Sequence, residues 1–129
     1  MKRKRLRIAV IGAGLGGPAT ASLLQSAGYD VKVYEQSPGF SRIGAGINLS
    51  PNVVRILQRI GIGQRLAETG ARTSHWVSRA WDTGEVLLDY PLGEAAEKRY
   101  GAPYLCVHRG DFHALLMESV APGTIEFGK

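Results

Sequence analysis

The sequence predicts an α/β fold: a Rossmann-like unit with a parallel sheet, followed by the beginning of an antiparallel sheet. Three observations predict it. A short apolar run over residues 6–11 ends in glycines, a helical segment follows, and a second β-type run covers residues 30–35. A strand, a helix and a strand within about 30 residues are typical of a right-handed βαβ crossover. A hairpin pattern after residue 70 supplies the antiparallel part.

The βαβ unit is predicted element by element. The run over residues 6–11 is short, β-branched and apolar, which is typical of a buried parallel strand. Residues 14–27 are predicted to be helical, with Pro18 in the first turn, where a missing N–H costs nothing, and Gly28 as the stop. Residues 30–35 form the second strand.

A loop and two helices are predicted next. Residues 36–49 are rich in Gly, Ser and Pro, so we expect a loop. A helix should follow, with Ser50 as its N-cap, Pro51 in the first helical position and Gly61 at its end. A shorter helix is predicted around residues 64–68.

The pattern changes after Gly70. Residues 75–81 and 85–90 are strand-like, and Asp82-Thr83-Gly84 between them is a turn sequence suited to a hairpin. A short helix is predicted over residues 92–99. An antiparallel hairpin inside a parallel α/β chain indicates a second layer or domain.

The last part returns to alternating elements. We predict a strand over residues 104–108, a helix that Asp111 caps and that runs to Val120, and a final strand over residues 124–127.

The net charge of +5 comes from basic residues at the start of the chain. Without five basic residues near the start, the chain has 11 basic and 11 acidic residues. No stripe of Lys or Arg with interleaved aromatic residues follows, so we expect no nucleic-acid partner. The five residues are Lys2, Arg3, Lys4, Arg5 and Arg7.

Cysteine and histidine usage excludes further classes. Cys106 is the only cysteine, so no internal disulfide can form and a cytoplasmic location is predicted. No run approaches the ~20 apolar residues of a membrane span, and no signal-peptide core follows the basic start. The three histidines lack metal-ligand spacing, so no metal site is expected.

The segment Gly12-Ala13-Gly14-Leu15-Gly16-Gly17 is G-x-G-x-x-G between a strand and a helix. In this motif Gly12 permits the tight turn, Gly14 lets the backbone approach a pyrophosphate, and Gly17 lets helix and strand pack closely. Glu35 follows at the end of the second strand, where a carboxylate accepts from a ribose 2′-OH and repels a 2′-phosphate. These residues predict an adenine dinucleotide site and leave both NAD and FAD open.

Longer stretches carry a resemblance to a family. IGAGLGGPATASLLQSAGYDVKVYEQ, then RIGAGINLSPN, then HRGDFHALL resemble the N-terminal part of FAD-dependent aromatic hydroxylases. These are the single-component flavoprotein monooxygenases that include salicylate and 6-hydroxynicotinate hydroxylases. The resemblance spans roughly residues 6–129 and favours FAD over NAD.

The resemblance implies roles for individual residues. Leu15 and Gly16 would lie on the cofactor, and Gln36 would join Glu35 in holding the adenosine ribose. Asn48 is a departure, because the 6-hydroxynicotinate branch has a histidine that resembles a substrate contact at this place. Asn48 is therefore a candidate for substrate contact, with loop hydrogen bonding as the alternative.

Further contacts follow from the loop and from the later strand end. Arg42 would reach the flavin side of the cofactor, and Ala45-Gly46-Ile47 would pass beside the isoalloxazine. Arg109 would contact the FAD chain, since an arginine can pair with phosphate or ribitol oxygens.

The resemblance also implies a reaction. NADH or NADPH would reduce FAD, O2 would form a flavin C4a-hydroperoxide, and a small aromatic substrate would be hydroxylated. Family members are several-fold longer, so we expect a truncated chain that is inactive by itself. A homo-oligomer is compatible with the sequence.

The resemblance divides the chain into three parts. Residues 1–70 would bind the ADP moiety of FAD, residues 71–100 would be a hairpin insertion belonging to a substrate-domain sheet, and residues 101–129 would return to the FAD-binding domain. Two alternatives stay open: the nucleotide domain of an NAD-dependent dehydrogenase, and a non-catalytic nucleotide-binding or interaction module.

Overall fold

The computed structural model describes residues 6–129, so the basic residues Lys2–Arg5 lie outside the described part. In chain order the elements are β1 (Arg7–Ile11), α1 (Gly16–Ser26), β2 (Asp30–Glu35), β3 (Gly46–Leu49), α2 (Pro51–Arg59), α3 (Gly63–Thr69), β4 (Ala71–Arg72), β5 (His75–Arg79), β6 (Val86–Pro91), α4 (Gly93–Tyr100), β7 (Leu105–His108), α5 (Arg109–Glu118) and β8 (Ile125–Phe127).

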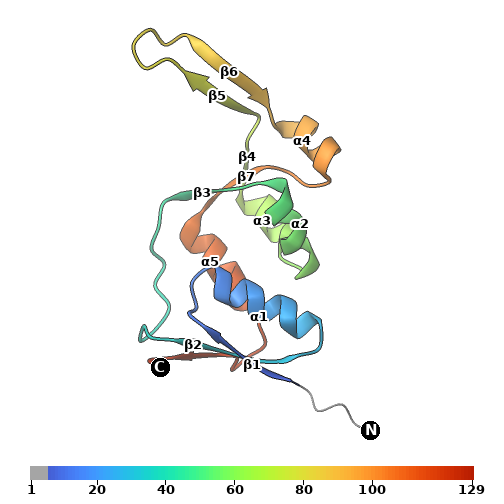
Figure 1. Cartoon of the computed structure of the whole chain (residues 1–129), viewed down its shortest axis with the longest axis vertical. Coiled ribbons are helices and arrows are strands. Elements are labelled where there is room, and N and C mark those ends of the chain that lie inside the picture. The colour runs from blue at the N-terminus through green and yellow to red at the C-terminus, as the bar shows by residue number, and fades with distance from the viewer. Residues whose placement is uncertain (1–5) are drawn as a thin grey trace.

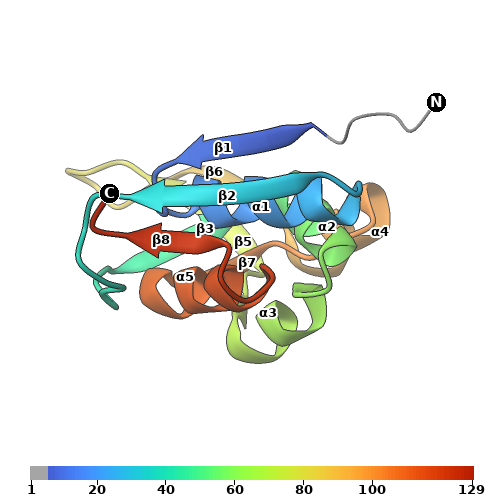
Figure 2. The same cartoon turned by 90° about the horizontal axis from the view of Figure 1, so that it is seen from below.

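The first sheet is parallel and has the order β1-β2-β8. Figure 2 shows the three strands side by side and pointing the same way, and Figure 1 shows α1 and α5 on one side of them. The predicted α/β class is confirmed: strand, helix and parallel strand follow one another at the start of the chain.

The prediction that the first strand is buried is wrong. Arg7, Ala9 and Ile11 are exposed, and the Ile11 side chain is 81% accessible. The reason is that β1 is an edge strand of this sheet, and only one of its faces is covered by α1. Ile8 and Val10 on the covered face pack against the buried cluster of α1 and β2.

The core has two clusters. The smaller one joins α1 to the parallel sheet through Ala21, Val31 and Val33. The larger one lies between α2, α3, β7 and α5, where Leu66, Leu105 and Leu116 are fully buried (0% accessible). Helix α5 contributes to both clusters, since Met117 packs against the smaller one.

The second sheet is antiparallel, with the order β3-β7-β4. It corrects the prediction of a loop over residues 36–49, because Gly46–Leu49 form β3 and pair with β7. The two-residue strand β4 was not predicted. In both cases the partner is β7, which comes much later in the chain, so no local pattern marks the pairing.

Two helix starts differ from the predictions, and α2 begins at Pro51 as predicted but without the expected capping hydrogen bond. Helix α1 begins at Gly16 rather than at residue 14, because the turn occupies Gly12–Leu15. Ser50 is the N-cap residue of α2, but its hydroxyl bonds the Asn52 side chain instead of a backbone N–H. His108 precedes α5 as its N-cap, so Asp111 lies inside the first turn and does not cap it.

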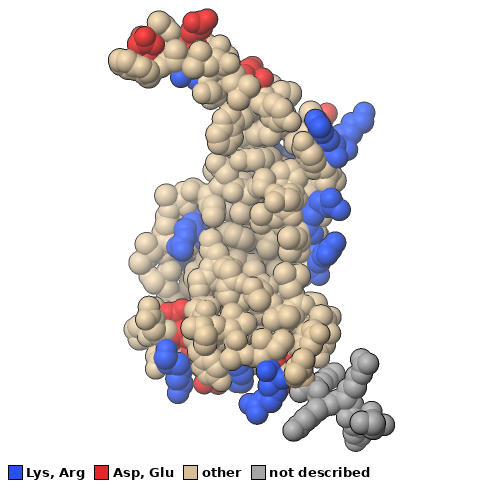
Figure 3. All heavy atoms as spheres, viewed as in Figure 1, with Lys and Arg blue, Asp and Glu red and all other residues tan. Residues whose placement is uncertain are grey.

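The predicted hairpin is present as β5 and β6, which pair antiparallel. Every residue of both strands is exposed. Figure 1 shows the hairpin projecting from the rest of the chain, and Figure 3 shows mostly uncharged side chains along it, with acidic groups near its far end. Within residues 6–129 no helix is both long and apolar enough to cross a membrane.

Candidate functional site

The glycine-rich turn joins the carboxyl end of β1 to the first turn of α1. Gly12 has φ +93°, a conformation that favours glycine, and its N–H donates to the Tyr34 carbonyl at 2.7 Å. Helix α1 has no side-chain N-cap hydrogen bond and no acidic residue in its first turn. Its first N–H groups are therefore available to an anion.

Two glycines of the turn have opposite surroundings. A Cβ on Gly17 would lie 1.9 Å from the Gly12 carbonyl oxygen, so this position has no room for a side chain. A Cβ on Gly14 would meet no atom within 4 Å. The backbone at Gly14 is thus open to a ligand, while Gly17 holds the helix against the strand end.

Glu35 ends β2 beside this turn. Its Oε2 accepts from the Ala13 N–H at 2.6 Å and its Oε1 accepts from the Ser37 N–H at 2.8 Å. Hydrogen bonds from these backbone N–H groups, first Ser37 and then Ala13, lower the pKa of the Glu35 carboxyl below its ordinary value. Each oxygen retains a lone pair that can accept from a ribose hydroxyl.

Stability should therefore fall on acidification. Because the folded-state pKa of Glu35 is lowered, its contribution is present above the ordinary pKa of 4.5 and is lost as pH falls through the folded-state value. We expect the urea concentration at the unfolding midpoint to decrease when the pH is lowered below 4.5. Glu35→Gln should make this midpoint depend less on pH. Glu85→Gln at the exposed hairpin turn is the control, and an equal effect of both variants would contradict the assignment.

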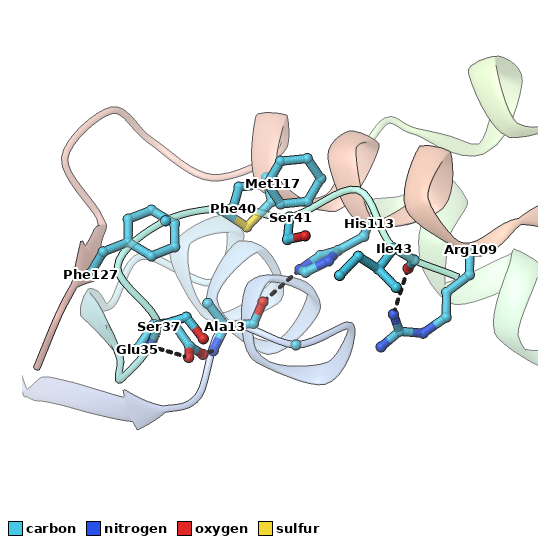
Figure 4. Close-up of a pocket in the computed structure, with 12 residues that line it drawn as sticks. Ala13, Glu35, Ser37, Phe40, Ser41, Ile43, Arg109, His113, Met117 and Phe127 are labelled. Carbon is cyan, nitrogen blue, oxygen red and sulfur yellow. Dashed lines mark hydrogen bonds between the residues drawn. The ribbon is translucent and has the colours of Figure 1, made fainter. Parts of the chain in front are cut away.

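A cavity of about 360 Å³ opens beside the glycine turn (Figure 4). It is lined by residues from the turn, the end of β2, the loop that follows, α5 and β8. Those residues are Ala13, Gly14, Glu35, Ser37, Gly39, Phe40, Ser41, Ile43, Arg109, His113, Met117 and Phe127.

Arg109 supplies the cavity with a cation. Its Nη1 donates to the Ile43 carbonyl at 3.0 Å, and its backbone N–H donates to the Ala45 carbonyl at 2.9 Å. A Cβ on Gly44 would lie 2.8 Å from the Arg109 Cβ, so the loop passes closely over this arginine. The contact places Arg109 on the cavity wall.

Arg42 is paired with Asp111. Arg42 Nε donates to Asp111 Oδ1 at 2.7 Å, and Nη2 contacts the same oxygen. This guanidinium is the main cause that lowers the pKa of the Asp111 carboxyl below its ordinary value. The Arg42 side chain lies over Gly110, because a Cβ added at Gly110 would be 2.7 Å from the Arg42 Cγ. Arg42 thus ties the loop to the start of α5.

The cavity brings together three of the sequence-predicted site residues: Gly14, Glu35 and Arg109. The others lie around it. Leu15 is half-buried and packs against the larger core cluster, while Gln36 is exposed. The remaining predicted residues that do not line the cavity are Gly12, Gly16, Gly17, Arg42, Ala45, Gly46 and Asn48.

Asn48 lies on β3, where it pairs with Cys106 of β7, and it is exposed. Sequence reasoning missed His113 and Phe40 as cavity residues. The signal for His113 was its spacing of four from Arg109, which puts both on one face of a helix.

The polar groups around the cavity fit a nucleoside diphosphate. Free N–H groups at the start of α1 and the Arg109 cation suit phosphate oxygens, and the Glu35 carboxylate suits ribose hydroxyls. No cluster of three or more His, Cys, Asp or Glu side chains among residues 6–129 could hold a metal ion.

Comparison with known proteins defines the class. The profile of the family described as "FAD binding domain" matches residues 5–123, and the chain belongs to this family. The resemblance to FAD-dependent hydroxylases is confirmed by the relatives. The 6-hydroxynicotinate 3-monooxygenase of Pseudomonas fluorescens is 58% identical over 123 residues, which are 95% of this chain and 32% of the relative.

One further relative and one solved structure are similar to this chain over nearly its whole length. The 3-amino-4-hydroxybenzoate 2-monooxygenase of Streptomyces cremeus is 41% identical over 129 residues, all of this chain and 33% of that protein. The crystal structure of a Klebsiella pneumoniae HpxO variant complexed with FAD superposes with a TM-score of 0.81 at 26% identity, covering 97% of this chain and 32% of that one. The chain thus spans about a third of its relatives' length.

Proposed function

We propose that this chain is the FAD-binding portion of an aromatic-ring monooxygenase that uses NADH or NADPH and O2. The observation that carries the proposal is the 58% identity with a 6-hydroxynicotinate 3-monooxygenase over 95% of the chain. The activity belongs to a polypeptide of the relatives' length, of which this chain spans about a third. By itself the chain should bind the cofactor without hydroxylating a substrate.

The residues of the glycine turn hold the ADP half of FAD. The first N–H groups of α1 donate to the pyrophosphate, which approaches over Gly14, with Leu15 and Gly16 beside it. Glu35 accepts from the adenosine ribose, and Gln36 lies next to it.

Residues of the loop and of α5 hold the rest of the cofactor. Arg109 donates to oxygens of the chain that links the two halves of FAD, and its place on the cavity wall supports this role. Arg42 keeps the loop close to α5 through Asp111, so that Ala45 and Gly46 lie beside the isoalloxazine. FAD supplies electron transfer from the nicotinamide and activation of O2 when bound.

The substrate is a small aromatic ring that carries a hydroxyl and a carboxylate. The names of three relatives support this class: 6-hydroxynicotinate, 3-amino-4-hydroxybenzoate and 3-hydroxybenzoate each have both groups. Asn48 is the candidate substrate contact. Its exposed position on β3 leaves its amide available for a polar group of the ring.

The domain organisation follows the same proposal. Residues 1–70 and 101–129 form the FAD-binding domain, and the pairing of β7 with β3 supports this grouping. Residues 71–100 belong to a substrate-domain sheet. The exposure of both faces of the β5–β6 hairpin supports that assignment for the hairpin, while β4 at the start of this part pairs with β7. The single thiol, Cys106, supports a cytoplasmic location, and the proposal leaves a homo-oligomer open.

The proposal predicts FAD binding by this chain and activity at full length. Titrating FAD into the purified chain should quench flavin fluorescence, with ADP as a competitor and NADP as a poor one, because Glu35 repels a 2′-phosphate. A polypeptide of full length should oxidise NADH or NADPH and consume O2 only when a hydroxylated aromatic carboxylate is present.

Each alternative gives a different result. A folded chain that binds NAD in preference to FAD would favour a dehydrogenase and overturn the proposal. Salt-sensitive nucleic-acid binding that is lost on deleting residues 2–7, without flavin binding, would favour an interaction module. A full-length protein that holds FAD but consumes no O2 with any such substrate would remove the monooxygenase part alone.

A further inference from the structure

His113 lies in the cavity and contacts the glycine turn from another element. It comes from α5, and its Nε2 lies 2.6 Å from the Ala13 carbonyl oxygen, 100 residues away in sequence. A carbonyl oxygen only accepts, so Nε2 must carry the proton in this contact. Figure 4 shows the ring directed at Ala13, between the turn and the loop.

The Ala13 residue is held at both of its backbone polar groups. Its N–H donates to Glu35 Oε2 at 2.6 Å, and its carbonyl accepts from His113. Ala13 is only 4% accessible and lies between two glycines, Gly12 and Gly14. Two elements that lie far apart in the sequence, β2 and α5, therefore fix Ala13, and the Gly12 N–H bond to the Tyr34 carbonyl holds the turn at the residue before it.

The His113 ring is itself fixed. The Phe40 ring meets it edge to face, with centroids 5.0 Å apart and planes at 74°. Arg109 and Met117, four residues before and after it, line the same cavity, so one face of α5 forms this wall. The donor is thus oriented before any ligand arrives.

Fixing this carbonyl matters because the turn is rich in glycine. Glycine loses more conformational freedom on ordering than any other residue, and a turn that must be ordered on binding loses affinity. The next peptide groups, from Gly14 to the start of α1, are those that face the open side of the turn. A constraint on Ala13 therefore sets the direction of the N–H groups that follow.

We propose that His113 is a positioning residue: its Nε2–H holds the Ala13 carbonyl, which orders the glycine turn for a pyrophosphate. This inference rests on the proposed binding of FAD by the glycine turn. It assigns His113 no contact with the cofactor and no part in the chemistry.

The test compares three substitutions in this chain. His113→Leu removes the donor, His113→Gln keeps an N–H at a similar reach, and His75→Leu removes an exposed histidine on β5. We expect His113→Leu to weaken FAD binding roughly tenfold, the equivalent of one hydrogen bond, and His113→Gln to recover most of that loss. His75→Leu should leave the affinity unchanged.

A second readout needs no FAD. In amide NMR spectra of the free chain, His113→Leu should shift the signals of Gly12, Ala13 and Gly14, and His113→Gln should shift them less. Equal FAD affinities for wild type and His113→Leu, or equal losses for the Leu and Gln variants, would overturn the inference. If the wild-type chain fails to bind FAD, the proposed function is wrong. If the amide signals of Gly12, Ala13 and Gly14 do not shift in His113→Leu, the positioning role is wrong, whatever the result with FAD.

Discussion

Replacing Gly17 with alanine is expected to destabilise the chain by more than about 3 kcal/mol, a large part of the roughly 5–15 kcal/mol that stabilises a typical folded domain. The added Cβ would lie 1.9 Å from the Gly12 carbonyl oxygen and 3.0 Å from its carbonyl carbon. Both atoms are backbone and cannot rotate away as a side chain would. Relief requires α1 to move off the end of β1.

The movement would be costly because α1 seals the parallel sheet. Ala21 on α1 and Val33 on β2 are both fully buried (0% accessible), and the Val33 side chain is also near Gly17. Separating helix and strand would expose this cluster and displace Gly12, whose φ of +93° only glycine adopts readily. Steric overlap and lost burial therefore act in the same direction.

Gly16→Ala is the matched control. Gly16 is the adjacent residue of the same helix, and a Cβ there would meet no atom within 4 Å. Alanine has the higher helix propensity, so this variant should be as stable as wild type or slightly more stable. Urea unfolding followed by circular dichroism measures both, and a Gly17→Ala midpoint equal to that of Gly16→Ala would contradict the packing argument.

The local parts of the fold were the predictable ones. The strand over Asp30–Glu35 matches β2 at both ends, and the hairpin was placed by its Asp82-Thr83-Gly84 turn. In these segments the signals are glycines, turn residues and alternation within a few positions. The pairing of β3 and β4 with β7 was not predictable, because it depends on residues more than 30 positions away.

The burial of β1 was predicted wrongly and the contact of His113 with Ala13 was not predicted, for related reasons. An apolar run does not reveal whether a strand is central or at an edge, and Ile11 is 81% accessible in this sheet. His113 has no local partner, and its contact with Ala13 arises only after β1, α1 and α5 have packed. The glycines and Glu35, by contrast, belong to one βαβ unit. Their spacing in the sequence was therefore sufficient to predict that Glu35 lies beside the glycine turn.

The second large effect is expected at Gly14, where alanine should leave the fold intact and weaken FAD binding by about 10- to 100-fold. A Cβ at Gly14 would meet no protein atom within 4 Å, and its φ lies outside the left-handed region, so the chain has no reason to unfold. The side chain would instead occupy the space beside the first N–H groups of α1. Losing one charge-assisted hydrogen bond to a phosphate costs about 1.5–3 kcal/mol, which corresponds to that range of affinity.

The variant also separates two kinds of damage that a single binding assay would merge. Gly14→Ala should have the urea midpoint of wild type, bind FAD and ADP weakly, and bind adenosine as wild type does, because adenosine has no pyrophosphate to meet the new methyl group. Gly14→Val should lower the affinity for ADP further at the same stability. Equal loss for adenosine and ADP would show that the substitution disturbs the turn as a whole, and an unchanged ADP affinity would place the pyrophosphate away from Gly14.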